Sequence, residues 1–373
     1  MKWRPALTAA VLCAVLSAAG PAWARPAAPF DGHTGPRGLL VTVLQKPVVL
    51  SDPAAVDALA DYAKKARIRT IYIQVYRANR ASFRTAESCG AEYRRLCLRL
   101  KEDPLERLIE RCHRDGIQVY GWMNLLSLGA NADAPLLQRY GPSILTKNRR
   151  PKRALKDYLI DGQYFLEPGD ARVQDALVRL TGDLVRFYPA LDGVLFDYVR
   201  YPDKDPDCGY TDSNIRQFKL QTGHSTVGPK SSSWAQWKRS RVTGLLTRLA
   251  SEAHVQRATV AVAATGLMPY SRAHLEASQD WKGWIKSGLV NFVMPMCYAD
   301  TIELFERYLT DLRATGIDLS KLRPAVGAYK FMSSPQEFRT QFQLCETVRP
   351  GETVVFHYGS LTENPLLSEV LKR

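Results

Sequence analysis

The fold is indicated most clearly by the stretch Asp192-Gly-Val-Leu-Phe-Asp-Tyr-Val-Arg-Tyr-Pro202. Its apolar centre, Val194 to Phe196, is typical of a parallel strand that is covered on both faces. The strand ends in a carboxylate, Asp197, and a loop of basic and aromatic residues follows it. In a barrel of parallel strands, catalytic residues stand at the carboxyl ends of the strands. Asp197 is therefore the first candidate for a catalytic residue.

Seven further apolar runs accompany this one, and helical patterns separate most of them. Strands that alternate with helices predict a parallel sheet, and eight such units predict a closed (β/α)8 TIM barrel of the α/β class. The long segment 127–170 should lie over the carboxyl end of this barrel, because βα-loops build that face. The expected strands are 38–44, 70–76, 118–125, 193–199, 259–265, 291–298, 324–329 and 353–357.

The first residues resemble a secretory signal peptide. Lys2 and Arg4 precede a short apolar run, and Ala22-Trp-Ala24 is suited to cleavage. We therefore expect a signal peptide at 1–24, a linker at 25–37 and a single barrel domain at 38–373, exported to the periplasm or beyond. No later apolar stretch has the length of a membrane span, so stable membrane insertion is not expected.

The chain carries a formal net charge of +14. The basic residues are scattered, with one run at 147–156, and they indicate either a solvated surface or attraction to a polyanion such as an acidic polysaccharide. No nucleic-acid-binding motif is present, so nucleic acid is not an expected partner. The sequence does not predict an oligomeric state.

Cysteine and histidine spacing does not indicate a metal site. CxxC, HExxH and histidine clusters are missing from the sequence, so neither a metal nor another cofactor is predicted. An exported protein can form disulfides. Because Cys89 and Cys97 are close together in a loop-like segment, we expect them to be bridged.

The expected strand ends combine aromatic rings with polar groups. Side chains alternate along a strand, so one set on each strand faces the barrel interior. Flat rings suit the faces of sugars, and amide or charged groups suit sugar hydroxyls. The expected substrate-binding residues are Gln74, Tyr76, Trp122, Asn124, Arg200, Tyr201, Tyr298 and Tyr358.

The segment 192–202 is similar to the signature of the glycosyl-hydrolase-like 10 family, whose fold is a (β/α)8 barrel. Three further segments, 164–169, 234–241 and 279–298, resemble motifs of the same family in the same order. The resemblance implies an exported hydrolase of bacterial amino-sugar polymers, such as peptide-free peptidoglycan strands or poly-N-acetylglucosamine.

Glycoside hydrolysis ordinarily requires an acid and a second carboxylate. Asp197 is the expected acid, and Asp300 and Glu167 are candidates for the second group. If the substrate carries an N-acetyl group, that group could replace the second carboxylate. A carbohydrate-binding barrel without catalysis remains an alternative, because a fold does not determine a function. An exported esterase or deacetylase is disfavoured, because no G-x-S-x-G motif or metal-ligand set is present.

Overall fold

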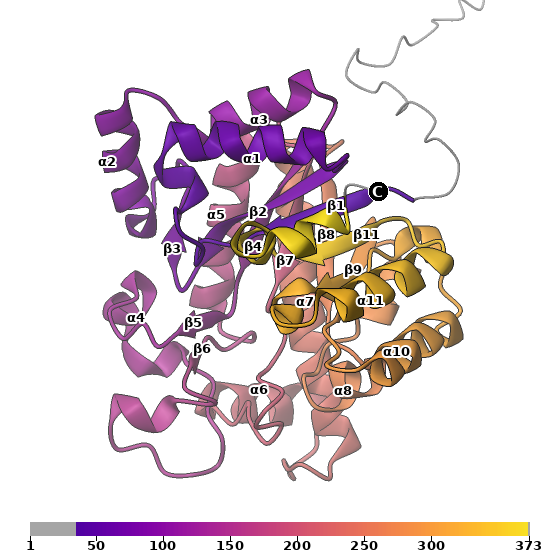
Figure 1. The fold of residues 1–373 in the computed structure, drawn as a ribbon. Helices are drawn as coiled ribbons and strands as arrows, with labels where there is room; N and C mark the ends of the chain where they lie inside the picture. Colours follow the sequence, from indigo (N-terminus) through magenta and orange to yellow (C-terminus); the bar gives the residue numbers. More distant parts are fainter. Residues whose placement is uncertain (1–34, 372–373) are drawn as a thin grey trace, which may run out of the picture.

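The computed structural model describes residues 35–371, and eight parallel strands close into a barrel within them (Figure 1). Around the barrel the order is β1, β2, β4, β7, β8, β9, β10 and β11, and β11 pairs again with β1. The predicted (β/α)8 barrel is confirmed. The strands are β1 Arg37–Val41, β2 Thr70–Arg77, β4 Gln118–Asn124, β7 Gly193–Asp197, β8 Ala261–Gly266, β9 Phe292–Cys297, β10 Ala325–Gly327 and β11 Thr353–Phe356. The expected signal peptide and most of the linker lie outside the described residues.

Helices surround the barrel (Figure 1). The sequence pattern predicts one helix over 275–287, but only 281–286 of that range forms one, α9, which begins where the Asp280 side chain accepts a hydrogen bond from the Gly283 amide. No helix of residues 35–371 is both long and apolar enough to cross a bilayer. The helices are α1 Pro53–Lys65, α2 Ala91–Leu100, α3 Pro104–Arg114, α4 Pro135–Tyr140, α5 Ala171–Phe187, α6 Asp212–Thr222, α7 Ser232–Gln256, α8 Tyr270–Leu275, α9 Trp281–Lys286, α10 Ile302–Ala314, α11 Pro335–Thr347, α12 Tyr358–Glu363 and α13 Pro365–Glu369.

Buried side chains close the amino end of the barrel. The Tyr72 hydroxyl donates to Glu352 at 2.5 Å and accepts from Arg323 at 2.6 Å. The Arg323 guanidinium lies 3.6 Å from the centre of the Phe292 ring. Arg323 lies two residues before β10 and Glu352 directly precedes β11, so this cluster fills the base of the barrel. A ligand therefore has access only from the carboxyl end.

The segment 127–170 forms a small lobe beside that carboxyl end, with α4, β5 (Ser127–Gly129) and β6 (Tyr164–Phe165) at the lower left of Figure 1. Its basic residues pair with acids of the loop after β7 and of α6: Lys147 with Asp212 at 3.1 Å, and Arg149 with Asp207 at 2.9 Å. These ion pairs connect the lobe to that part of the chain, but they are solvent-exposed and contribute little to its stability.

The expected Cys89–Cys97 disulfide is wrong, since all six cysteines of residues 35–371 are free thiols. Cys89 lies in the 3-10 helix Ser88–Gly90, and Cys97 lies in α2, which follows directly. Eight helical residues span about 12 Å at a rise of 1.5 Å each. A disulfide needs a Cα separation of about 4.4–6.8 Å. The segment was expected to be a loop, and its helical conformation separates the two thiols.

Candidate active site

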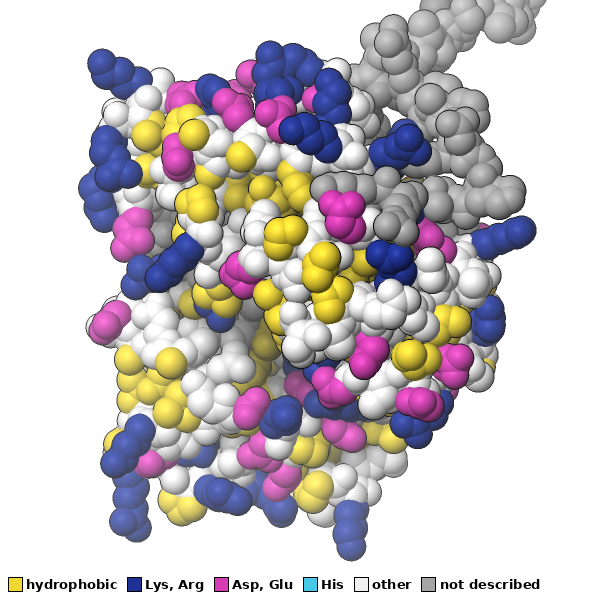
Figure 2. Space-filling model, viewed as in Figure 1, with side chains coloured by type: hydrophobic (Ala, Val, Ile, Leu, Met, Phe, Trp, Pro, Cys, Tyr) yellow, Lys and Arg dark blue, Asp and Glu magenta, His cyan; other side chains and the backbone are white. Residues whose placement is uncertain are grey.

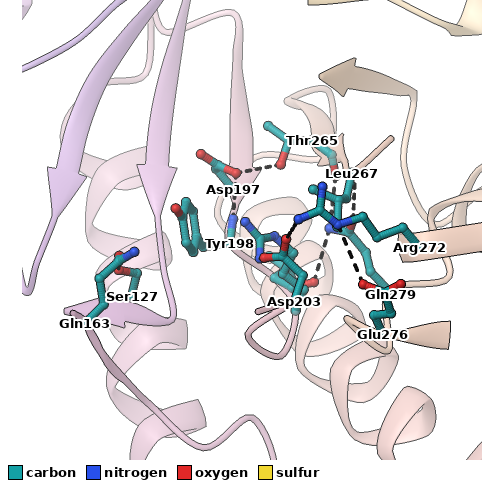
Figure 3. A network of polar contacts seen from close by, with 12 residues as sticks. Ser127, Gln163, Asp197, Tyr198, Asp203, Thr265, Leu267, Arg272, Glu276 and Gln279 are labelled. Carbon is teal, nitrogen blue, oxygen red and sulfur yellow. Dashed lines mark hydrogen bonds and ion pairs between the residues drawn. The ribbon is translucent and has the colours of Figure 1, made fainter. Parts of the chain in front are cut away.

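Asp197 is the last residue of β7, and three hydrogen-bond donors fix its carboxylate, of which Figure 3 draws Thr265 and Tyr198. The Thr265 hydroxyl and the Tyr198 amide donate to Oδ1 at 2.6 and 2.7 Å. The Trp122 indole N–H donates to Oδ2 at 3.1 Å. These donors come from β4, β8 and the residue after β7. Since Asp197 is only 4% exposed, its carboxylate is held in one orientation at the carboxyl end of the barrel.

Tyr198 has a backbone conformation that is uncommon for a residue with a side chain. Its φ is 54°, in the left-handed region, and such residues gather at active sites. The Tyr198 ring stacks on Phe165 with 6.2 Å between ring centres, and the Arg200 guanidinium lies 4.3 Å from the Tyr198 ring centre. Burial raises the pKa of Tyr198, so its phenol is protonated at neutral pH and can donate a hydrogen bond next to Asp197.

An aromatic wall, which we define as Trp122, Tyr298, Tyr329 and Phe356, stands beside Asp197. The ring centres of Tyr298 and Phe356 are 5.0 Å apart, and Tyr329 meets both rings edge-on at 5.9 and 5.5 Å. Trp122 meets Phe356 edge-on at 6.3 Å. Burial, and next the charge of Asp197, raise the pKa of Tyr298 well above its ordinary value. The wall therefore lies within the electrostatic reach of the carboxylate.

Tyr329 is the most accessible ring of this wall, with 40% of the residue exposed. It is not among the substrate-binding residues expected from the sequence. It lies in the 3-10 helix Ala328–Phe331, directly after β10. The signal was available, because Tyr329 is the last residue of the expected strand 324–329 and so occupies a strand end.

Polar atoms at this end of the barrel lack partners. Asn124 Oδ1, Gln45 Oε1 and His357 Nδ1 are buried and have no hydrogen-bond partner among the described residues. Asn124 stands opposite Asp197 in the β4–β7 register. Burial lowers the pKa of His357, so its ring is neutral at pH 7. Gln74, also expected here, is 2% exposed, and its carbonyl oxygen accepts from the Val43 amide at 3.2 Å. Buried unpaired acceptors are costly, and a bound sugar could satisfy them.

Two expected sugar-binding residues face away from this site. Tyr76 is fully buried and accepts a hydrogen bond from Asn79 at 2.9 Å. The β2–β4 register shifts between Gln74 and Tyr76, which turns Tyr76 into the outer core. Tyr358 starts α12 and packs edge-on against Tyr62 of α1 at 5.2 Å. Simple strand alternation did not allow for the irregularity in β2 or for the early end of β11.

Glu167 and Tyr201 form a buried structural pair rather than a part of the cleft. The Tyr201 hydroxyl donates to Glu167 at 2.5 Å, and the Gly169 amide donates to the same oxygen at 3.2 Å. Glu167 is 1% exposed and Tyr201 is fully buried. Burial raises the pKa of Glu167. This pair links the lobe 127–170 to the loop after β7, and substrate cannot reach it in this arrangement.

Asp300 and Arg200 bind other side chains. Asp300 is exposed at the rim and pairs with Lys330 at 2.5 Å. Arg200 pairs with Asp203 at 2.7 Å, and Asp203 is also bonded to Arg272 (Figure 3). Arg200 therefore supports the loop under Tyr198, and the carboxylate of Asp203 is shared by two guanidinium groups.

Gln279 and Thr265 are supporting residues that are not among the site residues expected from the sequence. The Gln279 amide group bonds the Leu267 amide at 2.9 Å and the Thr265 carbonyl at 3.2 Å (Figure 3). This contact fixes the end of β8, and so the hydroxyl that Thr265 presents to Asp197. Gln279 is the first residue of the segment 279–298, whose resemblance to a family motif could have pointed to it.

The surface is hollowed between the lobe that carries α4, β5 and β6 and the C-terminal helices (Figure 2). Two cavities, of about 420 and 630 Å³, lie elsewhere on the described chain, and Asp197 lines neither of them. We place the candidate active site at Asp197 because strand ends, fixed donors, aromatic rings and unpaired acceptors meet there.

Comparison with known proteins agrees with this geometry. Residues 37–321 match the sequence model of the family described as glycosyl hydrolase-like 10. A relative named glycosyl hydrolase DigH, from Escherichia coli K12, is 21% identical over 215 residues, which cover 52% of this chain and 46% of the relative. The chain thus spans about half the length of the curated relatives that it matches.

Solved structures share the fold at low identity. The glycoside hydrolase domain of PgaB from Bordetella bronchiseptica superposes with a TM-score of 0.68 at 14% identity, covering 90% of this chain and 98% of that one. The catalytic domain of a β-amylase from Paenibacillus polymyxa has a TM-score of 0.61 at 10% identity, covering 90% and 97%. The family match takes in Asp197 and its three donors, and the chain belongs to the glycosyl hydrolase-like 10 family.

Proposed function

We propose that the protein is an exported glycoside hydrolase that cleaves a bacterial amino-sugar polysaccharide, with Asp197 as its catalytic carboxylate. The observation that carries the proposal is the carboxylate at the end of β7, held by Trp122, Thr265 and the Tyr198 amide beside an aromatic wall. The family assignment and the relative named as a glycosyl hydrolase support the reaction class. The resemblance of the motifs supports the amino-sugar substrate.

Asp197 acts in this proposal by transferring a proton to the oxygen of the leaving sugar. The three hydrogen bonds stabilise the anion that remains after the proton has left. Oδ2 accepts only one of them, from Trp122, so it is the oxygen with room for a substrate contact. The same carboxylate then accepts a proton from the attacking water, as microscopic reversibility requires.

The second catalytic group is proposed to be the acetamido group of the substrate. Glu167 is buried in its pair with Tyr201, Asp300 is paired at the rim, and Asp203 is shared by two arginines. None of these three carboxylates is hydrogen-bonded to Asp197 or to the Trp122 and Thr265 side chains that hold it. Substrate-assisted hydrolysis needs one enzyme carboxylate with a neighbouring acetamido oxygen as nucleophile. The unpaired Asn124 and Gln45 oxygens are suited to hold sugar hydroxyls and the amide N–H during that attack.

Product analysis tests the proposal. Purified mature protein is incubated with peptide-free peptidoglycan strands and with poly-N-acetylglucosamine, and products are followed by mass spectrometry and by reducing-end release. We expect shorter oligosaccharides with new reducing ends, and inhibition by a thiazoline analogue of the cyclised acetamido intermediate. Binding without products would instead identify a carbohydrate-binding barrel. Release of acetate without reducing ends would identify a deacetylase.

A further inference from the structure

A tight hairpin at the end of β2 holds two arginines together. Ala78 and Asn79 connect β2 to β3 (Arg80–Ala81), and both are left-handed, with φ of 51° and 55°. Arg77 and Arg80 stand directly opposite each other in this antiparallel pair, an arrangement that destabilises a hairpin when the charges are alike. Asn79 is buried, donates to the Tyr76 hydroxyl at 2.9 Å and accepts from the Leu136 amide at 2.7 Å. The surrounding structure therefore enforces an unfavourable charge pair.

The positive charge of this hairpin is poorly compensated. Arg77 is half-buried, and its side chain has no ion-pair or hydrogen-bond partner among residues 35–371. Arg80 reaches Glu92 of α2 at 3.4 Å, but the two side chains are 61% and 66% exposed. An exposed pair of this kind contributes little. One guanidinium therefore remains available to an anion.

A cavity of about 420 Å³ lies against the hairpin, and both Arg77 and Arg80 line it. Val43, Val48 and Leu50 supply an apolar wall. Residues that follow β1 and β2 line the cavity together with Glu92, Tyr93 and Leu96 of α2, so it lies beside the carboxyl ends of these two strands. Strands are spaced about 4.8 Å apart, so β2 and β7, which are separated by β4, lie about 10 Å apart along the barrel wall. One long ligand can reach both places.

We propose that this cavity binds a carboxylate-bearing substituent of the glycan chain, with Arg77 as the principal contact and Arg80 as the second. A guanidinium matches a carboxylate by two parallel hydrogen bonds, and the apolar wall suits the carbon atoms that carry it. The site would make the enzyme prefer glycans with free carboxylates over neutral ones. The identity of the ligand as a glycan rests on the proposed function, whereas the recognition of its carboxylate is measured separately.

Calorimetric binding tests the proposal, in the Asp197→Asn background so that the ligand survives. The probes are a peptide-free peptidoglycan oligosaccharide with free carboxylates, the same oligosaccharide as its methyl ester, and an N-acetylglucosamine oligomer of equal length. We expect esterification to weaken binding about tenfold, the equivalent of one charge-assisted contact. Arg77→Gln should cause the same loss and make binding insensitive to esterification. Glu92→Gln, which removes the competing carboxylate, should tighten binding of the free acid.

Arg95→Gln is the matched control, because Arg95 is an exposed arginine of α2 that does not line the cavity. It removes the same charge and should leave all three affinities nearly unchanged. The proposal would be overturned by any of three results. The wild-type cavity could bind acid and ester equally, Arg77→Gln could weaken binding of the neutral oligomer as much as that of the acid, or no probe could bind. Absence of hydrolysis with an intact ester effect would overturn only the proposed enzymatic activity.

Discussion

Replacement of Asp197 by Asn is the most informative perturbation of the active site, because the structure predicts effects on both activity and stability. Oδ1 accepts from Thr265 and from the Tyr198 amide, and Oδ2 accepts from Trp122. An asparagine offers one carbonyl oxygen and one NH2 group in these places. Either orientation makes the NH2 group face an N–H donor, of Trp122 or of Tyr198, so one N–H loses its acceptor.

The two effects have different magnitudes. General acid–base catalysis contributes roughly 10²–10⁴-fold, so turnover should fall by that factor. A buried donor without a partner costs about 1–3 kcal/mol, so the free energy of unfolding should fall by about that amount. Trp122→Phe removes one of the competing donors and lets the amide oxygen face Thr265 and Tyr198. The stability cost of Asp197→Asn should therefore be smaller in the Trp122→Phe background, and a double-mutant cycle isolates this coupling.

The assays are reducing-end release from the glycan and urea unfolding of the four proteins of the cycle. Asp300→Asn is the matched control for activity, since it neutralises an exposed carboxylate at the rim and should leave turnover nearly unchanged. Near wild-type turnover in Asp197→Asn would refute the catalytic role. A cost in unfolding free energy that is equal in both backgrounds would refute the account of the hydrogen bonds.

Three further predictions address neighbouring residues. Burial raises the pKa of Glu167 above its ordinary 4.5, so the folded state holds a proton that the unfolded state releases as pH rises through 4.5. Above that pH, Glu167→Gln should therefore be more stable than the wild type in urea unfolding, and it should keep its turnover. A loss of turnover would return Glu167 to the active site. Thr265→Val removes the hydroxyl that donates to Oδ1 of Asp197. It should lower kcat about tenfold or more, because a hydrogen bond to a charged group is lost, and Thr265→Ser should restore kcat. An unchanged kcat in Thr265→Val would contradict this positioning role. Tyr329→Ala should raise KM at both low and high salt while Tyr329→Phe should not, because ring contact is not screened by ions; a normal KM in Tyr329→Ala would remove Tyr329 from the cleft.

Long-range periodicity made the barrel predictable from the sequence. All eight expected strands are present, because apolar runs bounded by helical patterns report burial on both faces of a parallel sheet. The ends of the strands were less predictable. The last strand was expected to reach residue 357, but β11 ends at Phe356 and α12 begins at Tyr358. The start of α9 at Trp281 depends on the side-chain cap of Asp280, which hydrophobic periodicity does not record.

The positions of site residues on regular strands were predicted correctly from strand alternation, whereas those of residues on irregular backbone were not. Asp197, Trp122 and Asn124 were expected on one end of the barrel and lie there, because β4 and β7 are regular and paired in register. Tyr76 faces the outer core because β2 is irregular after Gln74. Glu167 and Tyr201 are internal because they pair with each other across a long sequence separation. Such a tertiary pair leaves no trace in strand alternation.

The pairing of charges is also a tertiary property that the sequence does not show, and it affects where an anionic glycan is expected to bind. The run 147–156 is the most conspicuous basic stretch of the sequence, yet Lys147 and Arg149 pair with acids of the facing loop and helix. Two basic residues of the run therefore already have acidic partners within the fold. Arg77 is inconspicuous in the sequence, but the structure leaves its charge unpaired in a cavity. An attractive field at a binding surface depends on charge that the fold has not already compensated. An anionic glycan that extends from Asp197 toward β2 should therefore contact the unpaired charge of Arg77.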